Sequence, residues 1–218
     1  MSALEAGPVI ALVTLGAVHG INPAMGWLFA VALGLQERRA RAVWRALPPL
    51  ALGHALAVAV VVLLGLAVGH VVPHNVLRYG TAAVLLVFGV HRLLRGHRHP
   101  RFGGMRVGSR DLTVWSFLMA SAHGAGLMVL PFVMPAAATA GAAAGHEAHM
   151  AHAGVMAGEI TGLAAAGVHT ASYLMVTGIL AVVVYERVGL RMLRTAWINL
   201  DVLWAIALIA TALVTPFI

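Results

Sequence analysis

Four histidines stand inside long apolar stretches of the chain, at His19, His54, His123 and His169. An ionisable side chain at membrane depth is costly, and such residues usually face the interior of a helix bundle or a water-filled path. A neutral imidazole is a good ligand for zinc, nickel, cobalt and copper, and a histidine takes up a proton with a reference pKa of about 6.5. The four residues therefore indicate a shared site for a metal ion, with proton coupling through the same rings. Hydrogen-bonded contacts between helices are the structural alternative.

The neighbours of the first histidine, in "HGINPAMG" (residues 19–26), add to this indication. Asn22 lies three residues after His19, so in a helix the two side chains share a face. Pro23 has no amide hydrogen, and the carbonyl of His19 therefore loses its helical partner. A freed carbonyl at membrane depth is tolerated where it lines a cavity or is satisfied by a neighbour. An ordinary proline kink is the alternative.

The elements that carry these residues are predicted to be membrane-spanning helices. Of the 218 residues, 61% are hydrophobic and 10% are charged, and the mean hydropathy is +0.93. This balance lies outside that of a soluble domain and predicts an all-α, polytopic membrane protein. Six stretches approach the roughly 20 residues that cross a hydrocarbon core. They cover 8–35, 47–71, 75–94, 114–136, 160–186 and 195–217.

The basic residues report topology. All fourteen are arginines, and thirteen fall in three connections, at 38–45, 92–110 and 187–194. By the positive-inside rule these connections face the cytoplasm, which places both termini outside a prokaryote-type cytoplasmic (inner) membrane. The charge of +7 therefore does not indicate nucleic-acid binding. The first residues carry no positive charge, which favours a retained first span over a cleaved signal peptide. The absence of cysteine excludes disulfides and thiolate metal sites.

The two halves of the chain show a weak internal repeat. "GAVHGINPAMG" in the first span corresponds to "ASAHGAGLMVL" in the fourth, and "LGHALAV" in the second corresponds to "GVHTASY" in the fifth. Three spans per half place the halves in opposite orientations, which is the inverted repeat that many transporters use to build a midplane site. The predicted organisation is therefore a first repeat at 1–94, a basic linker at 95–113 and a second repeat at 114–218.

Two further features complete the candidate site. The Ala/Gly-rich segment 137–158, predicted to lie outside, carries His146, His149 and His152, and such a tract can capture transition-metal ions. A polar loop that happens to be histidine-rich is the alternative. Asp201, at the start of the sixth span, is a candidate for proton coupling or for substrate counter-charge, although pairing with a nearby arginine explains it equally well.

The motif "HGINPAMG", followed after a basic loop by "LGHALAV", resembles the lysine-exporter type (LysE) superfamily of six-span membrane proteins. It is most similar to the nickel/cobalt efflux permease branch. The resemblance implies an inverted repeat, a His-rich loop and transport of divalent transition metals, with His19, Pro23 and His54 on motif positions. Met25 stands where the motif has its second histidine, and Asn22 stands where many members have an acidic residue. The softer, less charged set leaves nickel, cobalt, zinc, copper and a non-metal solute open.

The sequence thus predicts a transporter and not an enzyme. No Walker loop, nucleophile elbow, zinc-protease motif or dinucleotide fingerprint is present, so coupling to ATP within this chain is unsupported. The predicted site combines His19, Asn22 and His123 near the midplane, with His54 and His169 beside them. No permanently bound cofactor is expected, since the metal ion is the substrate. A second hypothesis makes the chain a non-transporting subunit that binds haem or metal in a larger membrane complex. A third is a scaffold, and homo-oligomerisation stays open.

Overall fold

The computed structural model describes residues 6–69, 71–95, 108–143, 148–188 and 200–217. This part of the chain is helical, and the predicted all-α class is confirmed. A helix satisfies its backbone N–H and C=O groups internally, which a segment in lipid requires. The described α-helices are α1 (Ala6–Ile21), α2 (Trp27–Glu37), α3 (Ala40–Gly69), α4 (His74–Arg95), α5 (Ser109–Ala122), α6 (Ala125–Ala143), α7 (Ala148–Val183) and α9 (Leu200–Val214), with short helical turns η1 (Pro23–Met25), η2 (Val184–Val188) and η3 (Thr215–Phe217).

Some of these helices are long and apolar enough to cross a membrane. Among the described residues, α3 and the segment Ile160–Arg187 meet that requirement, and the bent pair α5 and α6 makes a third if it is one span. The remaining apolar helices in the described ranges are shorter, at Gly7–Ile21, Trp27–Glu37, Asn75–His91 and Ala205–Phe217. The structure is thus compatible with a membrane protein, while the count of six spans stays a prediction.

Two predicted spans are broken, and both breaks follow a histidine. The stretch predicted as one span at 8–35 is divided into α1 and α2 by η1, where Asn22 is extended and its side-chain oxygen accepts from the Ala24 N–H at 3.0 Å. Gly26 closes the turn with a φ of 122°, which favours glycine. The stretch predicted at 114–136 bends by 63° between α5 and α6, next to Gly124 with a φ of 73°. The disturbance expected at Pro23 is thus present as a turn between two helices, because local turn geometry replaces the helical ladder there.

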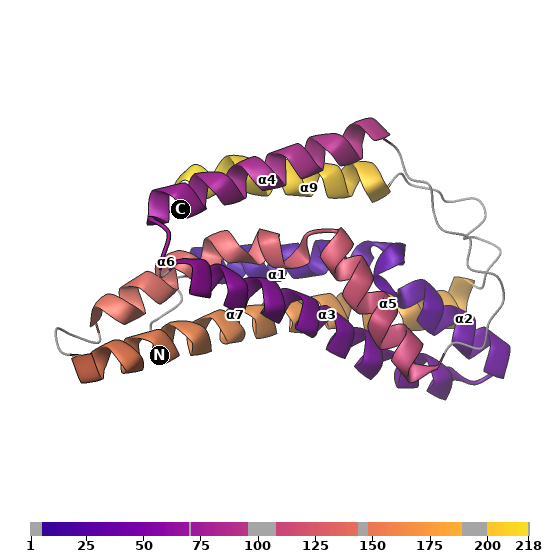
Figure 1. The fold of residues 1–218 in the computed structure, drawn as a ribbon. Coiled ribbons are helices and arrows are strands. Elements are labelled where there is room, and N and C mark those ends of the chain that lie inside the picture. Colours follow the sequence, from indigo (N-terminus) through magenta and orange to yellow (C-terminus); the bar gives the residue numbers. More distant parts are fainter. Residues whose placement is uncertain (1–5, 70, 96–107, 144–147, 189–199, 218) are drawn as a thin grey trace.

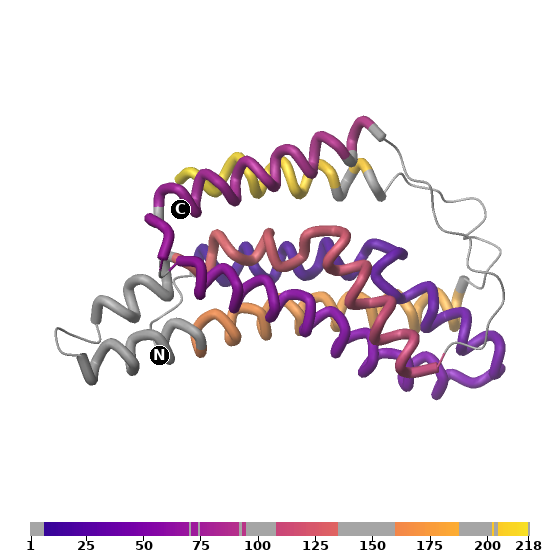
Figure 2. Tube along the Cα trace, viewed as in Figure 1, coloured from indigo at the N-terminus to yellow at the C-terminus, as the bar shows by residue number. Residues whose placement is uncertain are grey.

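Helices of the two halves of the chain pack on one another. Helix α1 lies along α7, α3 contacts α5, α6 and α7, and α4 pairs with α9. Figure 1 shows α4 and α9 side by side along one flank, with the other helices gathered beneath them. The trace in Figure 2 shows that segments far apart in sequence, from indigo α1 to orange α7, share one bundle. Helix α7 is the common neighbour of α1 and α3, so it positions whatever those two helices carry.

Glycines set the closest approach between helices. A Cβ on Gly16 would overlap the carbonyl oxygen of His169, and a Cβ on Gly20 would lie 2.7 Å from that of Tyr173. The pair has the small-xxx-small spacing that lets membrane helices pack backbone to backbone. On the other side of the bundle, a Cβ on Gly53 would overlap the Thr113 carbonyl oxygen of α5. Helices α1 and α3 are therefore held at backbone contact with their neighbours.

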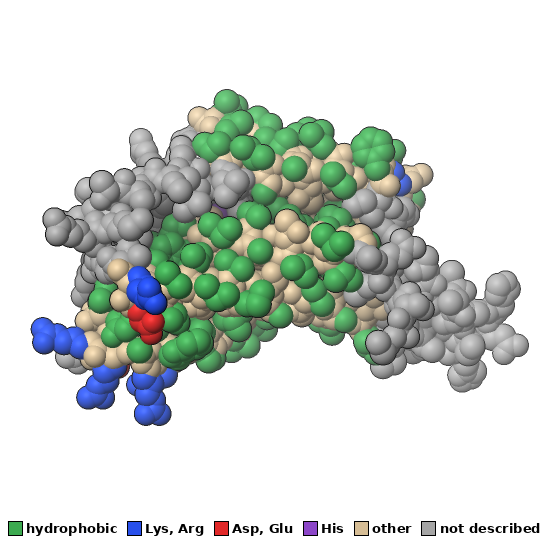
Figure 3. Space-filling view, turned by 180° about the vertical axis from the view of Figure 1, so that it is seen from behind, with side chains coloured by type: hydrophobic (Ala, Val, Ile, Leu, Met, Phe, Trp, Pro, Cys, Tyr) green, Lys and Arg blue, Asp and Glu red, His purple; other side chains and the backbone are tan. Residues whose placement is uncertain are grey.

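The surface divides into an apolar flank and a basic end. Large aliphatic side chains lie on the outer faces of the helices, such as Leu64 at 60% and Val87 at 69% exposure. In Figure 3 hydrophobic side chains cover the visible flank, and most of the described arginines gather at one end. That end is the corner between α2 and α3, where Arg38, Arg41 and Arg45 are exposed. An apolar flank with a basic end fits a chain surrounded by lipid, and the predicted orientation of the termini stays a prediction.

Candidate histidine site

Three of the four histidines in the apolar stretches meet inside the helix bundle. The rings of His19 on α1, His54 on α3 and His169 on α7 form a triangle, and we call these residues the histidine triad. Their ring centroids lie 5.4 Å apart for His19 and His54, 4.8 Å for His19 and His169, and 5.4 Å for His54 and His169. All three side chains are fully buried. The structure therefore brings to His19 the two histidines that were predicted to flank the site.

Backbone carbonyls fix the hydrogen on two of the triad rings. Nδ1 of His19 lies 2.9 Å from the carbonyl oxygen of Leu15, one turn earlier on α1, and Nδ1 of His169 lies 3.3 Å from that of Leu12 across the α1–α7 contact. A carbonyl oxygen can only accept, so in each ring Nδ1 carries the hydrogen and donates it. In the neutral ring, Nε2 then holds the lone pair. This is the arrangement found in metal-binding histidines, whose second nitrogen commonly donates to a carbonyl.

His54 is the least satisfied member of the triad. Within the part of the chain that the structure describes, neither of its ring nitrogens has a hydrogen-bond partner, and the same holds for Nε2 of His169. A buried polar group left unsatisfied costs about 1–3 kcal/mol, which a fold tolerates where the group has another use. The ring of His54 stacks on that of Tyr173, with centroids 4.0 Å apart and planes at 12°. His54 is therefore held by ring contacts rather than by hydrogen bonds.

The other predicted site residues lie at the two helix breaks. His123 ends α5, is 3% exposed and donates from Nδ1 to the Met119 carbonyl oxygen at 2.7 Å. It is close enough to His19 for an electrostatic interaction. Asn22 and Met25 are both buried, and the Asn22 side chain caps the turn that Pro23 begins. Asn22 is thus used by the local backbone, while Met25 packs at the same break.

The carbonyls at the first break find partners nearby. The His19 carbonyl oxygen, which Pro23 deprives of its helical donor, accepts instead from the Asn22 N–H at 3.2 Å. The Trp27 indole donates to the Ile21 carbonyl oxygen at 3.0 Å, and the Tyr173 hydroxyl donates to that of Met25 at 2.7 Å. A freed carbonyl in a membrane can line a cavity or bond to a neighbouring group, and at this break the carbonyls bond to neighbouring groups.

Several predicted site residues lie outside the described residues or have side chains that the structure does not describe. His146 lies in the gap at 144–147. His149 and His152 belong to the backbone of α7, and Asp201 to that of α9, but their side chains are not described. The predictions that the outer tract captures ions and that Asp201 takes part in coupling therefore stay predictions.

The triad as placed does not form a finished metal centre. No group of three or more His, Cys, Asp or Glu side chains among the described residues is arranged to hold a metal ion. In this arrangement His19 meets His54 and His169 edge to face, at interplanar angles of 78° and 81°. Ion binding by the triad would need the rings to turn so that their nitrogens converge.

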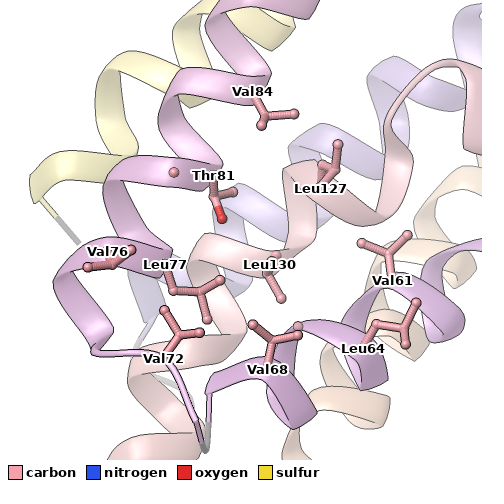
Figure 4. A pocket seen from close by; sticks show the side chains of 12 residues that line it. Val61, Leu64, Val68, Val72, Val76, Leu77, Thr81, Val84, Leu127 and Leu130 are labelled. Atoms are coloured by element: carbon pink, nitrogen blue, oxygen red, sulfur yellow. The ribbon is translucent and has the colours of Figure 1, made fainter.

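An apolar cavity elsewhere in the bundle is separate from the triad. It has a volume of about 340 Å³ and lies between α3, α4 and α6, lined by aliphatic side chains such as Leu64, Val68 and Leu130. Figure 4 shows these side chains pointing into it, with the hydroxyl of Thr81 as its polar group. The described side chains that line this cavity include no titratable group, so they offer no ligand for an ion.

Sequence reasoning missed Tyr173 and the glycines around His19. Tyr173 lies four residues after His169 and thus shares its helix face, a spacing that a search of α7 could have used. Gly16 and Gly20 flank His19 with the spacing of a close helix contact, which would have indicated that His19 faces another helix.

No family model, curated protein sequence or solved structure matches the chain.

Proposed function

We propose that the protein is a membrane transporter for a divalent transition-metal ion and that the histidine triad is its binding site. The observation that carries the proposal is the meeting of three buried imidazoles, from α1, α3 and α7, with centroids 4.8–5.4 Å apart. Buried imidazole nitrogens without a hydrogen-bond partner among the described residues, as on His54 and at Nε2 of His169, are costly unless a guest uses them. Imidazole nitrogen suits zinc, nickel, cobalt and copper, and these ions stay as the candidate substrates.

The hydrogen-bonding pattern favours an ion over a structural role. His19 and His169 each donate from Nδ1 to a backbone carbonyl, so Nε2 holds the lone pair that can bind an ion. Among the described residues, neither ring nitrogen of His54 has a hydrogen-bond partner. Histidines that serve only to join helices would bond across the interface, as Nδ1 of His169 does to Leu12, but neither ring nitrogen of His54 has such a bond among the described residues. The short distances also favour an ion over haem, because axial imidazoles must leave the iron and its macrocycle between them.

The packing supports the idea of two inverted halves. In the proposed repeat, α1–α2 corresponds to α5–α6, α3 to α7, and α4 to α9. The contact of α1 with α7 then has its counterpart in the contact of α5 and α6 with α3. The α3–α7 and α4–α9 contacts each join two corresponding helices. Both halves also break their first span close to a histidine, three residues after His19 and at His123 itself. A site between such halves is what alternating access requires.

In the proposed mechanism, the ion enters the bundle and gathers the triad nitrogens around it as the rings turn. The two helix breaks beside His19 and His123 would let the halves rock about the loaded site. The outer tract with His146, His149 and His152 would collect the ion, and proton uptake by neutral imidazoles would compete with it and help release.

The first test measures Zn²⁺ binding by His54→Ala. All proteins carry asparagine at His146, His149 and His152, so that the outer tract does not contribute, and binding is measured by titration calorimetry in detergent. We expect the dissociation constant to rise at least about 100-fold, because changes in the second shell of a metal site already cost 10–100-fold. The matched control is His91→Ala, an exposed histidine on α4, which should bind Zn²⁺ like its parent. Equal affinity of the two variants would remove the triad as the binding site.

A further inference from the structure

Tyr173 touches both the histidine triad and the break in the first span. Its side chain is fully buried in α7. The ring stacks on His54 at a centroid distance of 4.0 Å, and the hydroxyl donates to the Met25 carbonyl oxygen in η1 at 2.7 Å. Tyr173 therefore connects a candidate ligand on α3 with the turn that separates α1 from α2.

Few side-chain hydrogen bonds reach the break among the described residues. Turn bonds inside 22–26 close η1, the Trp27 indole bonds to Ile21, and the Tyr173 hydroxyl bonds to Met25. Thr177, also on α7, donates to the Gly20 carbonyl oxygen at 3.5 Å, one residue before Ile21, so Tyr173 makes the shorter of the two bonds from α7. Gly26, with a φ of 122°, gives the backbone at this point a conformation that other residues rarely adopt. A change in the position of Tyr173 would thus be felt first at this turn.

The stacking geometry links that position to the triad. The rings of His54 and Tyr173 are nearly parallel, at 12°, whereas His19 meets His54 edge to face. If the His54 ring turns out of this stack as the triad nitrogens converge on one ion, the parallel ring at 4.0 Å has to shift with it. Close packing transmits such a shift rather than absorbing it.

We propose that Tyr173 is a positioning residue that couples occupation of the histidine triad to the break between α1 and α2. This inference rests on the proposed function, since it needs an ion at the triad. When the ion turns His54, the tyrosine ring moves with it. The bond between the Tyr173 hydroxyl and the Met25 carbonyl oxygen is then strained or broken, and α2 becomes free to move against α1. Without the hydroxyl, the site would still bind the ion but would no longer move the break.

The test uses Tyr173→Phe, which keeps the stacked ring and removes only the hydroxyl. Zn²⁺ is the probe, because a closed-shell ion without redox chemistry binds imidazole and leaves indole fluorescence intact. Trp27 reports on the break, and the part of the emission change that disappears in Trp27→Phe is assigned to it. The matched control is Ser172→Ala, which removes an equally short bond, 2.7 Å, from α7 to the Val13 carbonyl oxygen in the unbroken part of α1.

We expect Tyr173→Phe to bind Zn²⁺ with its parent's affinity but to lose the Trp27 emission change, and its Zn²⁺ flux in liposomes to fall about tenfold, within the usual range of coupling between sites. Ser172→Ala should keep both. The coupling is wrong if Tyr173→Phe keeps the emission change, or if Ser172→Ala loses as much. If the parent itself does not bind Zn²⁺, the proposed function is wrong as well. If the parent binds Zn²⁺ and only the effect of Tyr173→Phe is missing, the coupling alone is wrong. Should Tyr173→Phe not fold, the parent still decides, because Zn²⁺ binding that leaves the Trp27 emission unchanged would contradict the coupling.

Discussion

A variant with His19→Asn and His169→Asn is expected to lose Zn²⁺ flux, by at least about 1000-fold relative to its parent, since each lost ligand should exceed the 10–100-fold cost of a second-shell change. The physical reason is that in both rings Nε2 holds the lone pair, because the Nδ1–H groups are bonded to carbonyls. Asparagine keeps a donor for a neighbouring carbonyl and removes the imidazole nitrogen. Flux is measured in liposomes loaded with a zinc-sensitive dye.

Two comparisons make this result interpretable. His91→Ala, at an exposed position of α4, should transport like the parent, which controls for the loss of a histidine as such. Circular dichroism of the double variant should show unchanged helix content, which controls for folding. If the double variant folds and moves Zn²⁺ at the rate of its parent, the triad has no part in transport.

The second large effect is expected at the contact between α1 and α7. Gly16→Ala should lower the free energy of unfolding by about 1–3 kcal/mol, the usual cost of overpacking. A Cβ there would overlap the His169 carbonyl oxygen and lie 2.9 Å from Cβ of Ser172, so α1 must move away from α7. Because the His19–His169 contact spans the same interface, the triad should open and Zn²⁺ affinity should fall with the stability. Unfolding in denaturing detergent, followed by circular dichroism, gives the first quantity.

The control for this prediction is Gly167→Ala on α7. Nothing lies within 4 Å of a Cβ at Gly167, and alanine is the better helix former by about 1 kcal/mol. The control should therefore be neutral or stabilised, and its Zn²⁺ affinity unchanged. A Gly16→Ala protein as stable as Gly167→Ala would mean that α1 and α7 are not held at backbone contact in the folded protein.

The sequence by itself determined the helical class, because a composition with 61% hydrophobic residues in long runs leaves the backbone few other ways to satisfy its polar groups in lipid. It also singled out the four histidines, since an ionisable group in an apolar run is conspicuous without any coordinates. The disturbance at Pro23 was predictable for the same local reason, the missing amide hydrogen. Its outcome was not, because the partners of the Ile21 and Met25 carbonyls depend on where Trp27 and Tyr173 lie.

Only the tertiary structure decided which histidines meet. His19 and His169 are 150 residues apart in the chain, and their contact depends on the rotation of α1 against α7, which Gly16 and Gly20 fix by backbone contact. Spacing along a helix says which side chains share a face, but not which helix that face meets. For that reason the sequence placed His123 and Asn22 at the centre, whereas packing joins His54 and His169 to His19 and adds Tyr173, a residue whose importance arises from its two neighbours.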